Sequence, residues 1–215
     1  MKSYSTVLSN ASAEIVIEKS RFIGQSFHVE DLEETENIIK EVKKKYYDAT
    51  HNCFAFIMGE DMSIAKANDD GEPSSTAGVP MLEVMKKLNL TNTLVIATRY
   101  FGGTKLGASG LIRAYAKTAK IALDANSIVN KKVYNKLILN IDYGLVGKIQ
   151  KYLENNQTIY DAPIFTEKVE FILYETEEKI NVLQKDLLDL TNANCKLQVG
   201  DKVYLDFVDG KYLKN

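Results

Sequence analysis

An apolar strand, a glycine-rich turn and a long helix follow one another in residues 93–124, and this order constrains the fold more than any other feature. Residues 93–100 are apolar over most of their length, which predicts a strand at the centre of a sheet. The helix is expected to begin at Leu106 or Ser109 and to end at Asp124. Glycines crowd the turn and the helix start, a composition typical of loops that serve a ligand: Gly102, Gly103, Gly107 and Gly110.

The same segment is locally basic in an otherwise acidic chain. Residues 98–120 contain five cations and no carboxylate, namely Arg99, Lys105, Arg113, Lys117 and Lys120. The last three have i, i+4 and i+7 spacing and therefore share a helix face. Free N–H groups and the dipole at a helix start favour an anion, so the segment predicts binding of a phosphate or an acidic group. The alternative is tight glycine packing beside a solvated cationic face.

The loop that precedes this region has three carboxylates within four residues, Asp69, Asp70 and Glu72. They could bind Mg²⁺ or act in acid–base chemistry. We favour the alternative that they cap backbone amides of the turn and pair with Arg99 or Lys105. Hydroxyls follow on the same loop at Ser74, Ser75 and Thr76.

Specific catalytic motifs are absent from the sequence. Neither G-x-x-x-x-G-K-S/T nor G-x-G-x-x-G is present, which argues against an NTPase or a dinucleotide enzyme. The G-x-S-x-G elbow of a serine nucleophile is also missing. His51 and Cys53 share one face of a predicted strand, and we interpret both as packing residues. We therefore predict no catalytic residue, no metal and no cofactor. Tyr100 and Phe101, at a strand end, could present a ring that stacks on a base.

The order of predicted elements indicates an α+β protein with two domains, residues 1–130 and 131–215. The first half reads as two hairpins, a strand and three helices, with the helices expected on one face of a sheet. The second half has the order β-α-β-β-α-β, which is the ferredoxin-like split motif. Its last two strands are expected at residues 196–199 and 203–207.

Charge, cysteine content and the lack of long apolar runs argue against a globally basic nucleic-acid-binding protein, a secreted protein and a membrane protein. The net charge is −2, with 15 basic against 16 acidic side chains in residues 1–130 and 12 against 13 in residues 131–215. Nucleic acid would therefore have to bind a local patch. The two cysteines suit a reducing compartment, and no apolar run resembles a signal peptide or a membrane span. We expect a cytoplasmic protein without a membrane partner.

Three motifs closely resemble the YigZ/IMPACT family, in its bacterial two-domain branch: A-T-H-N-C-F-A-F at 49–56, A-N-D-D-G-E-P-S-S-T-A-G at 67–78 and T-R-Y-F-G-G-T-K-L-G-A-S-G-L-I-R-A-Y at 98–115. K-S-R-F-I-G at 19–24 and D-Y-G-L-V-G-K-I-Q at 142–150 fit the same pattern. The resemblance implies a first domain like domain 2 of ribosomal protein S5. It implies a second, ferredoxin-like domain similar to those of elongation factor G.

The resemblance brings no established catalytic activity and favours a non-catalytic binding protein linked to regulation of translation. Its basic turn and helix are expected to contact RNA, the ribosome or an acidic protein surface. The alternatives are an enzyme acting on a small phosphorylated or nucleotide ligand and a module that captures an acidic peptide. The predicted binding residues are Asp69, Asp70, Glu72, Ser74, Thr76, Arg99, Tyr100, Phe101, Gly102, Gly103, Lys105, Gly107, Gly110, Arg113 and Lys117.

Overall fold

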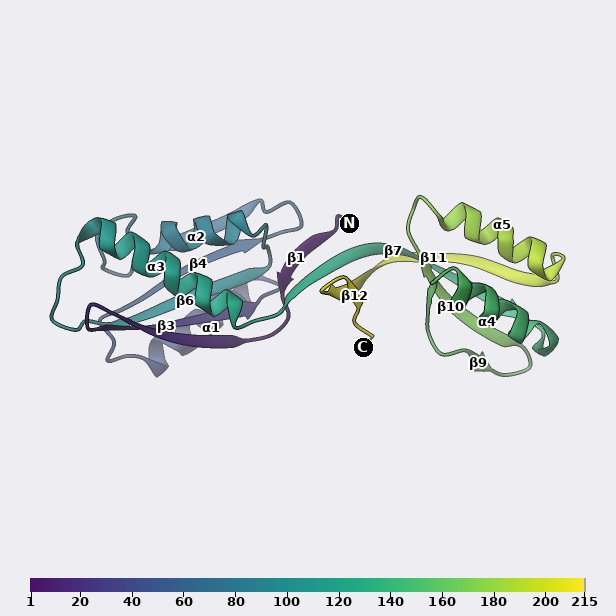
Figure 1. Ribbon diagram of the computed structural model, residues 1–215, viewed down its shortest axis with the longest axis horizontal. Coiled ribbons are helices and arrows are strands. Elements are labelled where there is room, and N and C mark those ends of the chain that lie inside the picture. Colours follow the sequence, from purple (N-terminus) through teal and green to yellow (C-terminus); the bar gives the residue numbers. More distant parts are fainter. Residues whose placement is uncertain (215) are drawn as a thin grey trace. The chain divides into compact units, whose positions relative to one another are not determined.

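The computed structural model describes residues 1–214 and has two β-sheets and five α-helices within them (Figure 1). The chain divides into two compact units. The N-terminal unit holds Lys2–Lys131 and the residues from Asp206 onward, and the C-terminal unit holds Lys132–Leu205. This mixed composition fits the predicted α+β class with two domains. The two fold names and the boundary after residue 130 stay predictions.

The N-terminal unit is built on a five-stranded antiparallel sheet of order β2-β3-β6-β4-β5. Strand β6 is central, as its apolar sequence predicts, and it is paired along its whole length with β3. The strands are β2 (Ala11–Ile17), β3 (Ser20–His28), β4 (His51–Met58), β5 (Ile64–Asn68) and β6 (Thr93–Tyr100).

Helices cover both faces of this sheet, so the expectation that they lie on one face is wrong. Helices α2 (Gly78–Lys87) and α3 (Gly107–Asp124) pack on the face that carries Cys53, Ala55 and Ile57 of β4. Helix α1 (Leu32–Lys45) packs on the opposite face, against Phe54, Phe56 and Met58 (Figure 1). The physical reason is that β4 and β6 are apolar at successive positions, and such strands need cover on both sides.

Two short strands in this unit escaped the sequence analysis. Strand β1 (Tyr4–Val7) pairs antiparallel with the start of β7 (Ile128–Ile141), with Val7 opposite Ile128. Strand β12 (Lys211–Tyr212) forms a tight hairpin with the end of β11 (Cys195–Val208). Both elements are too short for a period of two to be recognised in sequence.

The C-terminal unit follows the predicted order β-α-β-β-α-β except for one additional two-residue strand, β9 (Ile164–Phe165), which pairs with β10 (Val169–Glu175). The other strands are arranged β11-β7-β10-β8. Helices α4 and α5 share one apolar core with Leu137, Leu139 and Phe171. Strand β11 is continuous where two strands were predicted, because the chain stays extended through Gly200. The remaining elements are the 3₁₀ turn Tyr143–Leu145, α4 (Val146–Asn155), β8 (Ile159–Tyr160) and α5 (Ile180–Thr191).

Candidate functional site

The acidic loop is closed by its own carboxylates. Asp69 accepts hydrogen bonds from the backbone N–H groups of Ser75, Ala77 and Gly78 at 2.8, 3.0 and 2.9 Å. These amides lie at or just before the start of α2, where N–H groups lack helical partners and a negative charge is favoured. Asp69 therefore acts as a distant cap for α2, which is the capping role that the sequence analysis favoured.

Asp70 fastens the same loop to the sheet. It accepts hydrogen bonds from Lys43 Nζ at 2.5 Å and from the backbone N–H of Asn52 at 2.7 Å. Burial of the carboxyl raises its pKa, but the bonds from Lys43 and Asn52 outweigh that effect and hold the pKa of Asp70 below its usual value. His51 Nδ1 lies 2.8 Å from the Asp70 carbonyl oxygen, which can only accept, so Nδ1 carries the proton.

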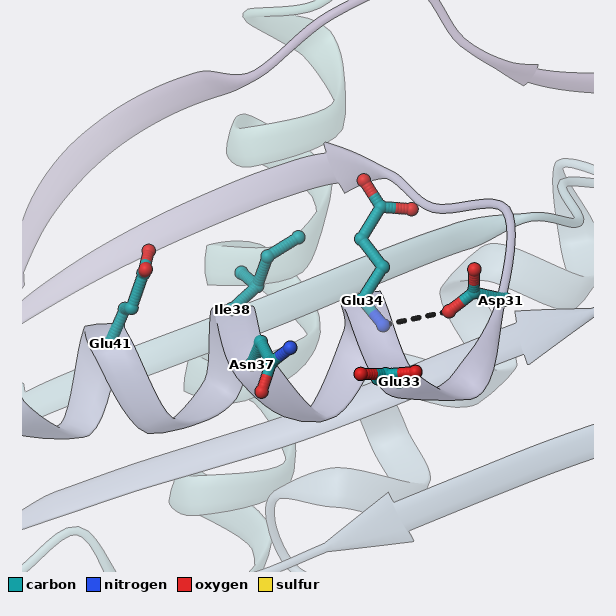
Figure 2. Close-up of a pocket in the computed structure, with 6 residues that line it drawn as sticks. All are labelled: Asp31, Glu33, Glu34, Asn37, Ile38 and Glu41. Atoms are coloured by element: carbon teal, nitrogen blue, oxygen red, sulfur yellow. Dashed lines mark hydrogen bonds between the residues drawn. The ribbon is translucent and has the colours of Figure 1, made fainter.

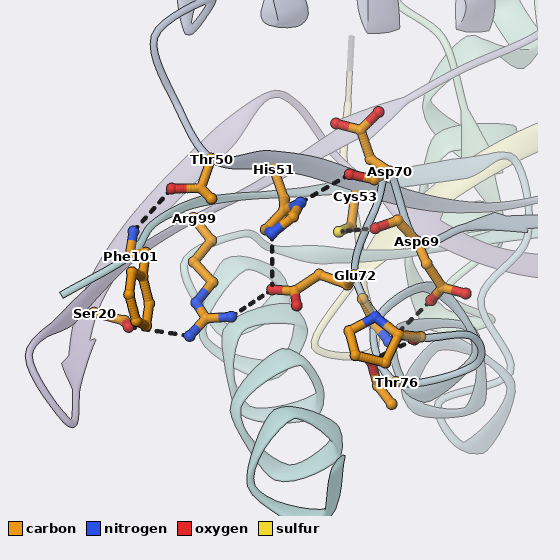
Figure 3. Close-up of polar contacts among 12 residues, drawn as sticks. Ser20, Thr50, His51, Cys53, Asp69, Asp70, Glu72, Thr76, Arg99 and Phe101 are labelled. Carbon is orange, nitrogen blue, oxygen red and sulfur yellow. Dashed lines mark hydrogen bonds and ion pairs between the residues drawn. The ribbon is translucent and has the colours of Figure 1, made fainter. Parts of the chain in front are cut away.

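Glu72 and Arg99 form a buried ion pair at the centre of the site (Figure 3). Arg99 Nη1 donates to Glu72 Oε1 at 2.6 Å, and the two side chains are only 5% and 4% exposed. The same oxygen accepts from the Tyr115 hydroxyl at 2.8 Å and lies 3.7 Å from His51 Nε2. Arg99 Nη2 also donates to Ser20 Oγ at 3.2 Å. This network joins β3, β4, β6, α3 and the acidic loop.

Aromatic rings flank the guanidinium of Arg99. Its Cζ lies 5.4 Å from the ring centroid of Phe22 and 5.5 Å from that of Phe101. Phe22 is buried, whereas Phe101 is 47% exposed. Arg99 is therefore not part of an exposed cationic face, although the sequence analysis counted it among the local positive charges.

Fewer cations are both exposed and free of an acidic partner than the sequence suggests. Lys120 pairs with Asp124 one turn further along α3. Lys105, Arg113 and Lys117 are exposed, and no carboxylate within residues 1–214 pairs with any of them. These three side chains line a cavity of ≈ 470 Å³ that we call the cationic groove. Its other lining residues are Ile17, Glu18, Thr104, Leu106, Gly110 and Ala114.

A second cavity, of ≈ 340 Å³, lies at the start of α3, and we call it the α3 pocket. Its lining combines the buried pair with apolar side chains and the first residues of the helix. No acidic residue lies in the first turn of α3, and its N-cap residue Leu106 makes no side-chain cap. The lining residues are Glu72, Pro73, Arg99, Phe101, Lys105, Leu106, Gly107, Ala108 and Leu111.

Other predicted binding residues have structural partners. Thr76 Oγ1 donates to the Pro73 carbonyl at 2.6 Å, and the Tyr100 hydroxyl donates to Asp48 at 2.9 Å. Ser74 is exposed on the loop. Of the glycines, Gly103 and Gly107 have left-handed φ values of 87° and 68° and open space around them, whereas Gly110 is buried beside the Leu106 side chain.

Three members of the site were not predicted from the sequence: Ser20, Lys43 and Tyr115. Ser20 and Tyr115 lie inside the segments that carry the family resemblance, at 19–24 and 98–115, and that is the signal that could have found them. Lys43 lies on α1, outside these segments, and carried no such signal. His51 was interpreted as a packing residue, and its ring is half-buried against the acidic loop.

The two cysteines differ in their environments. Cys53 is fully buried, and its thiol donates to the Asp69 carbonyl at 2.9 Å. Burial raises the pKa of Cys53 to about 12, so very little thiolate forms near neutral pH. Cys195 is only partly buried.

We expect a thiol reagent at neutral pH to label Cys195 in the native protein and to label Cys53 only after denaturation. A titration with a chromogenic disulfide, with and without denaturant, measures this directly. Cys195→Ser serves as the control and should remove native-state labelling. Rapid native labelling of that variant would show that the loop over Cys53 opens readily.

A third cavity, of ≈ 350 Å³, lies on α1 and is acidic (Figure 2). Asp31 caps the helix by accepting from the backbone N–H of Glu34 at 2.7 Å. The carboxylates of Glu33, Glu34 and Glu41 spread apart along the helix. Within residues 1–214 no group of carboxylates, histidines and cysteines is placed to hold a metal ion, here or elsewhere.

None of the helices in residues 1–214 combines the length and the apolar composition of a membrane span.

Comparison with known proteins gives a consistent family assignment. Residues 18–123 match the model of the Impact N-terminal domain, and residues 139–194 match a domain of unknown function, DUF1949. IMPACT family member YvyE of Bacillus subtilis is 44% identical over 96% of this chain and 95% of its own length. An IMPACT family member of Haemophilus influenzae is 30% identical over 85% of this chain and 90% of its own length.

A mammalian relative matches only part of the chain, whereas a solved structure matches nearly all of it. Protein IMPACT of rabbit, Oryctolagus cuniculus, is 42% identical over 30% of this chain and 20% of its own length. A solved structure described as a hypothetical protein superposes with a TM-score of 0.60 at 25% identity, covering 94% of this chain and 98% of that one. The likeness to YvyE and to this structure thus spans nearly the whole chain.

Proposed function

The chain belongs to the IMPACT family, and we propose that it is a non-catalytic binding protein linked to regulation of translation, whose cationic groove contacts the phosphates of RNA. The family resemblance supports the link to translation. The cationic groove supports binding to RNA, because lysine and arginine side chains that contact phosphates provide most of the sequence-independent affinity for nucleic acid.

The observation that carries this proposal is the separation of paired from unpaired cations around α3. Arg99 and Lys120 are neutralised by Glu72 and Asp124. The remaining three cations, Lys105, Arg113 and Lys117, line one groove. Among the described residues, Glu18 is the only acidic one that shares this lining. A local positive patch on a chain of net charge −2 is what a protein needs to bind RNA without being globally basic.

The enzyme alternative has less support from the site. Each of the three loop carboxylates already accepts hydrogen bonds within the chain, so its use as a general base or a metal ligand would disturb contacts that hold the loop. Direct contact of Asp69, Asp70 or Glu72 with a ligand stays a prediction.

An acidic peptide is the other alternative, and it would bind the same cationic groove as RNA. Nuclease treatment of the RNA distinguishes the two partners.

We expect the protein to co-sediment with ribosomes and bulk RNA at about 50 mM salt and much less at about 200 mM salt. Charge reversal in the double variant Arg113→Glu/Lys117→Glu should abolish co-sedimentation, because it turns two attractive contacts into repulsive ones. Lys40→Glu/Lys44→Glu is the matched control, since these exposed lysines have the same i, i+4 spacing on α1. It should retain most of the binding.

Three results would contradict the proposal. The first is no co-sedimentation at low salt, and the second is binding by the groove variant that equals that of the wild type. The third is co-sedimentation that survives nuclease treatment of the RNA, which would favour an acidic protein partner.

A further inference from the structure

The α3 pocket adjoins the cationic groove, with Lys105 and Leu106 lining both cavities. We propose that the α3 pocket takes one unpaired nucleotide of a single-stranded RNA, with the base against Phe101 and the phosphate at the start of α3. This inference rests on the proposed function and adds to it the kind of RNA that is bound. Duplex RNA could reach the groove, but only an unstacked base could enter the pocket.

The apolar part of the pocket suits a base. Phe101 is 47% exposed, and Pro73, Leu106 and Leu111 continue the same lining. Exposed aromatic rings bind bases by stacking, with little preference for sequence. The volume of ≈ 340 Å³ lies within the range of ligand pockets, about 300–1,000 Å³.

The polar end of the pocket suits a phosphate. Gly107 and Ala108, the first residues of α3, line it, and no acidic side chain in that turn competes for their free N–H groups. Lys105 lies next to this turn, is exposed and adds a full positive charge. Gly107 has φ 68°, and apart from its chain neighbours and the backbone of its own helix no described atom lies within 4 Å of the point that a Cβ would occupy there, so the helix start is also sterically open.

An independent sign of a ligand comes from the buried pair that lines the same pocket. Arg99 is 5% exposed, and its Nε has no hydrogen-bond partner in the described chain. Glu72 Oε1 takes three polar contacts, whereas no hydrogen bond within residues 1–214 reaches Oε2 (Figure 3). Buried polar atoms are normally paired, so an orphaned donor in this lining calls for an explanation. Arg99 is a lining residue of the pocket, and the edge of a base offers acceptors to a guanidinium.

The test uses the full chain and fluorescence anisotropy of a short labelled oligouridylate, with unlabelled uridine monophosphate as competitor. Phe101→Ala should weaken oligonucleotide binding about tenfold, because it removes the stacking ring. It should leave the salt dependence of binding unchanged, because it removes no charge. Phe165→Ala is the matched control, since Phe165 is similarly exposed in the C-terminal unit, and it should bind as the wild type does.

A second variant guards against a simple loss of folding. Ala108→Glu places a carboxylate in the first turn of α3, where negative charge stabilises a helix, yet it should abolish binding by repelling the phosphate. Binding of the oligonucleotide by both Phe101→Ala and Ala108→Glu at wild-type strength would overturn the inference. If RNA binding then still depended on Arg113 and Lys117, the proposed function would stand without it.

The competitor identifies the source of the nucleotide. Displacement of the oligonucleotide by uridine monophosphate in the wild type, and not in Ala108→Glu, supports a pocket for one nucleotide. Tight binding of the mononucleotide without any binding of the oligonucleotide would overturn the assignment to RNA and indicate a free nucleotide as ligand. Binding of neither probe would overturn both proposals.

Discussion

Glu72→Ala is expected to lower the free energy of unfolding of the N-terminal unit by about 3–5 kcal/mol, the usual cost of leaving one charge of a buried pair without its partner. Arg99 would keep its guanidinium in a site where it is only 5% exposed, with Ser20 as its one remaining polar contact among the described residues. The Tyr115 hydroxyl would lose its acceptor as well. Urea denaturation followed by circular dichroism measures the change.

The matched control is Glu83→Ala, which removes the carboxylate of an exposed pair with Lys86 on α2. We expect it to change stability by less than about 0.5 kcal/mol, because solvent screens exposed pairs. A similar small effect for Glu72→Ala would mean that the site relaxes and lets water reach Arg99. That result would contradict a stabilising role for the network that joins the acidic loop to β3, β4, β6 and α3.

Gly102→Ala is the second substitution with a large expected effect, about 3 kcal/mol or more of destabilisation. A Cβ at this position would lie 1.9 Å from the carbonyl oxygen of Lys19 and 2.5 Å from the backbone nitrogen of Ser20. Both are backbone atoms, so no side-chain rotation can relieve the clash. The turn after β6 would have to move away from β3, and Ser20 and Arg99 would move with it. Thermal and urea denaturation measure the loss.

Gly147→Ala makes the same chemical change where the structure has room. Gly147 is the second residue of α4 and has no left-handed backbone conformation. Apart from its chain neighbours and the backbone of its own helix, no described atom lies within 4 Å of the added Cβ. We expect it to stabilise the C-terminal unit by up to about 1 kcal/mol, because alanine favours a helix over glycine. A mild effect of Gly102→Ala, comparable in size to this one, would contradict the close packing of the turn.

Much of the fold could be predicted from periodicity in the sequence. The apolar run at residues 93–100 identified β6 at its observed bounds, and the helix expected to end at Asp124 is α3. The face covered by α1 could not be predicted, because a strand with apolar residues at every position does not show which helix covers which side. The strands β1 and β12 could not be predicted either, because each is short and is recognised as a strand only by its pairing. Strand β1 pairs with the distant β7, and β12 pairs with the end of β11.

The site was only partly predictable for a similar reason. Capping by Asp69 follows from local turn chemistry, and the sequence analysis favoured it. The pairing of Glu72 with Arg99 was one of several options for two residues 27 positions apart, and burial is what decides it. Counting charge along the chain therefore overstated the exposed positive patch. Gly102 was read as part of an anion-binding turn, whereas its observed role is to allow close contact of two backbones.

The salt dependence of binding to single-stranded RNA tests the central claim most directly. Contacts from Lys105, Arg113 and Lys117 to phosphates predict a slope of log affinity against log salt of about −2, from about 0.7 for each contact. Neutralising one of them in Lys117→Gln should make the slope shallower by about 0.7, with Lys40→Gln as the unchanged control. A slope near zero, or one that Lys117→Gln leaves unaltered, would contradict the assignment of RNA binding to the cationic groove.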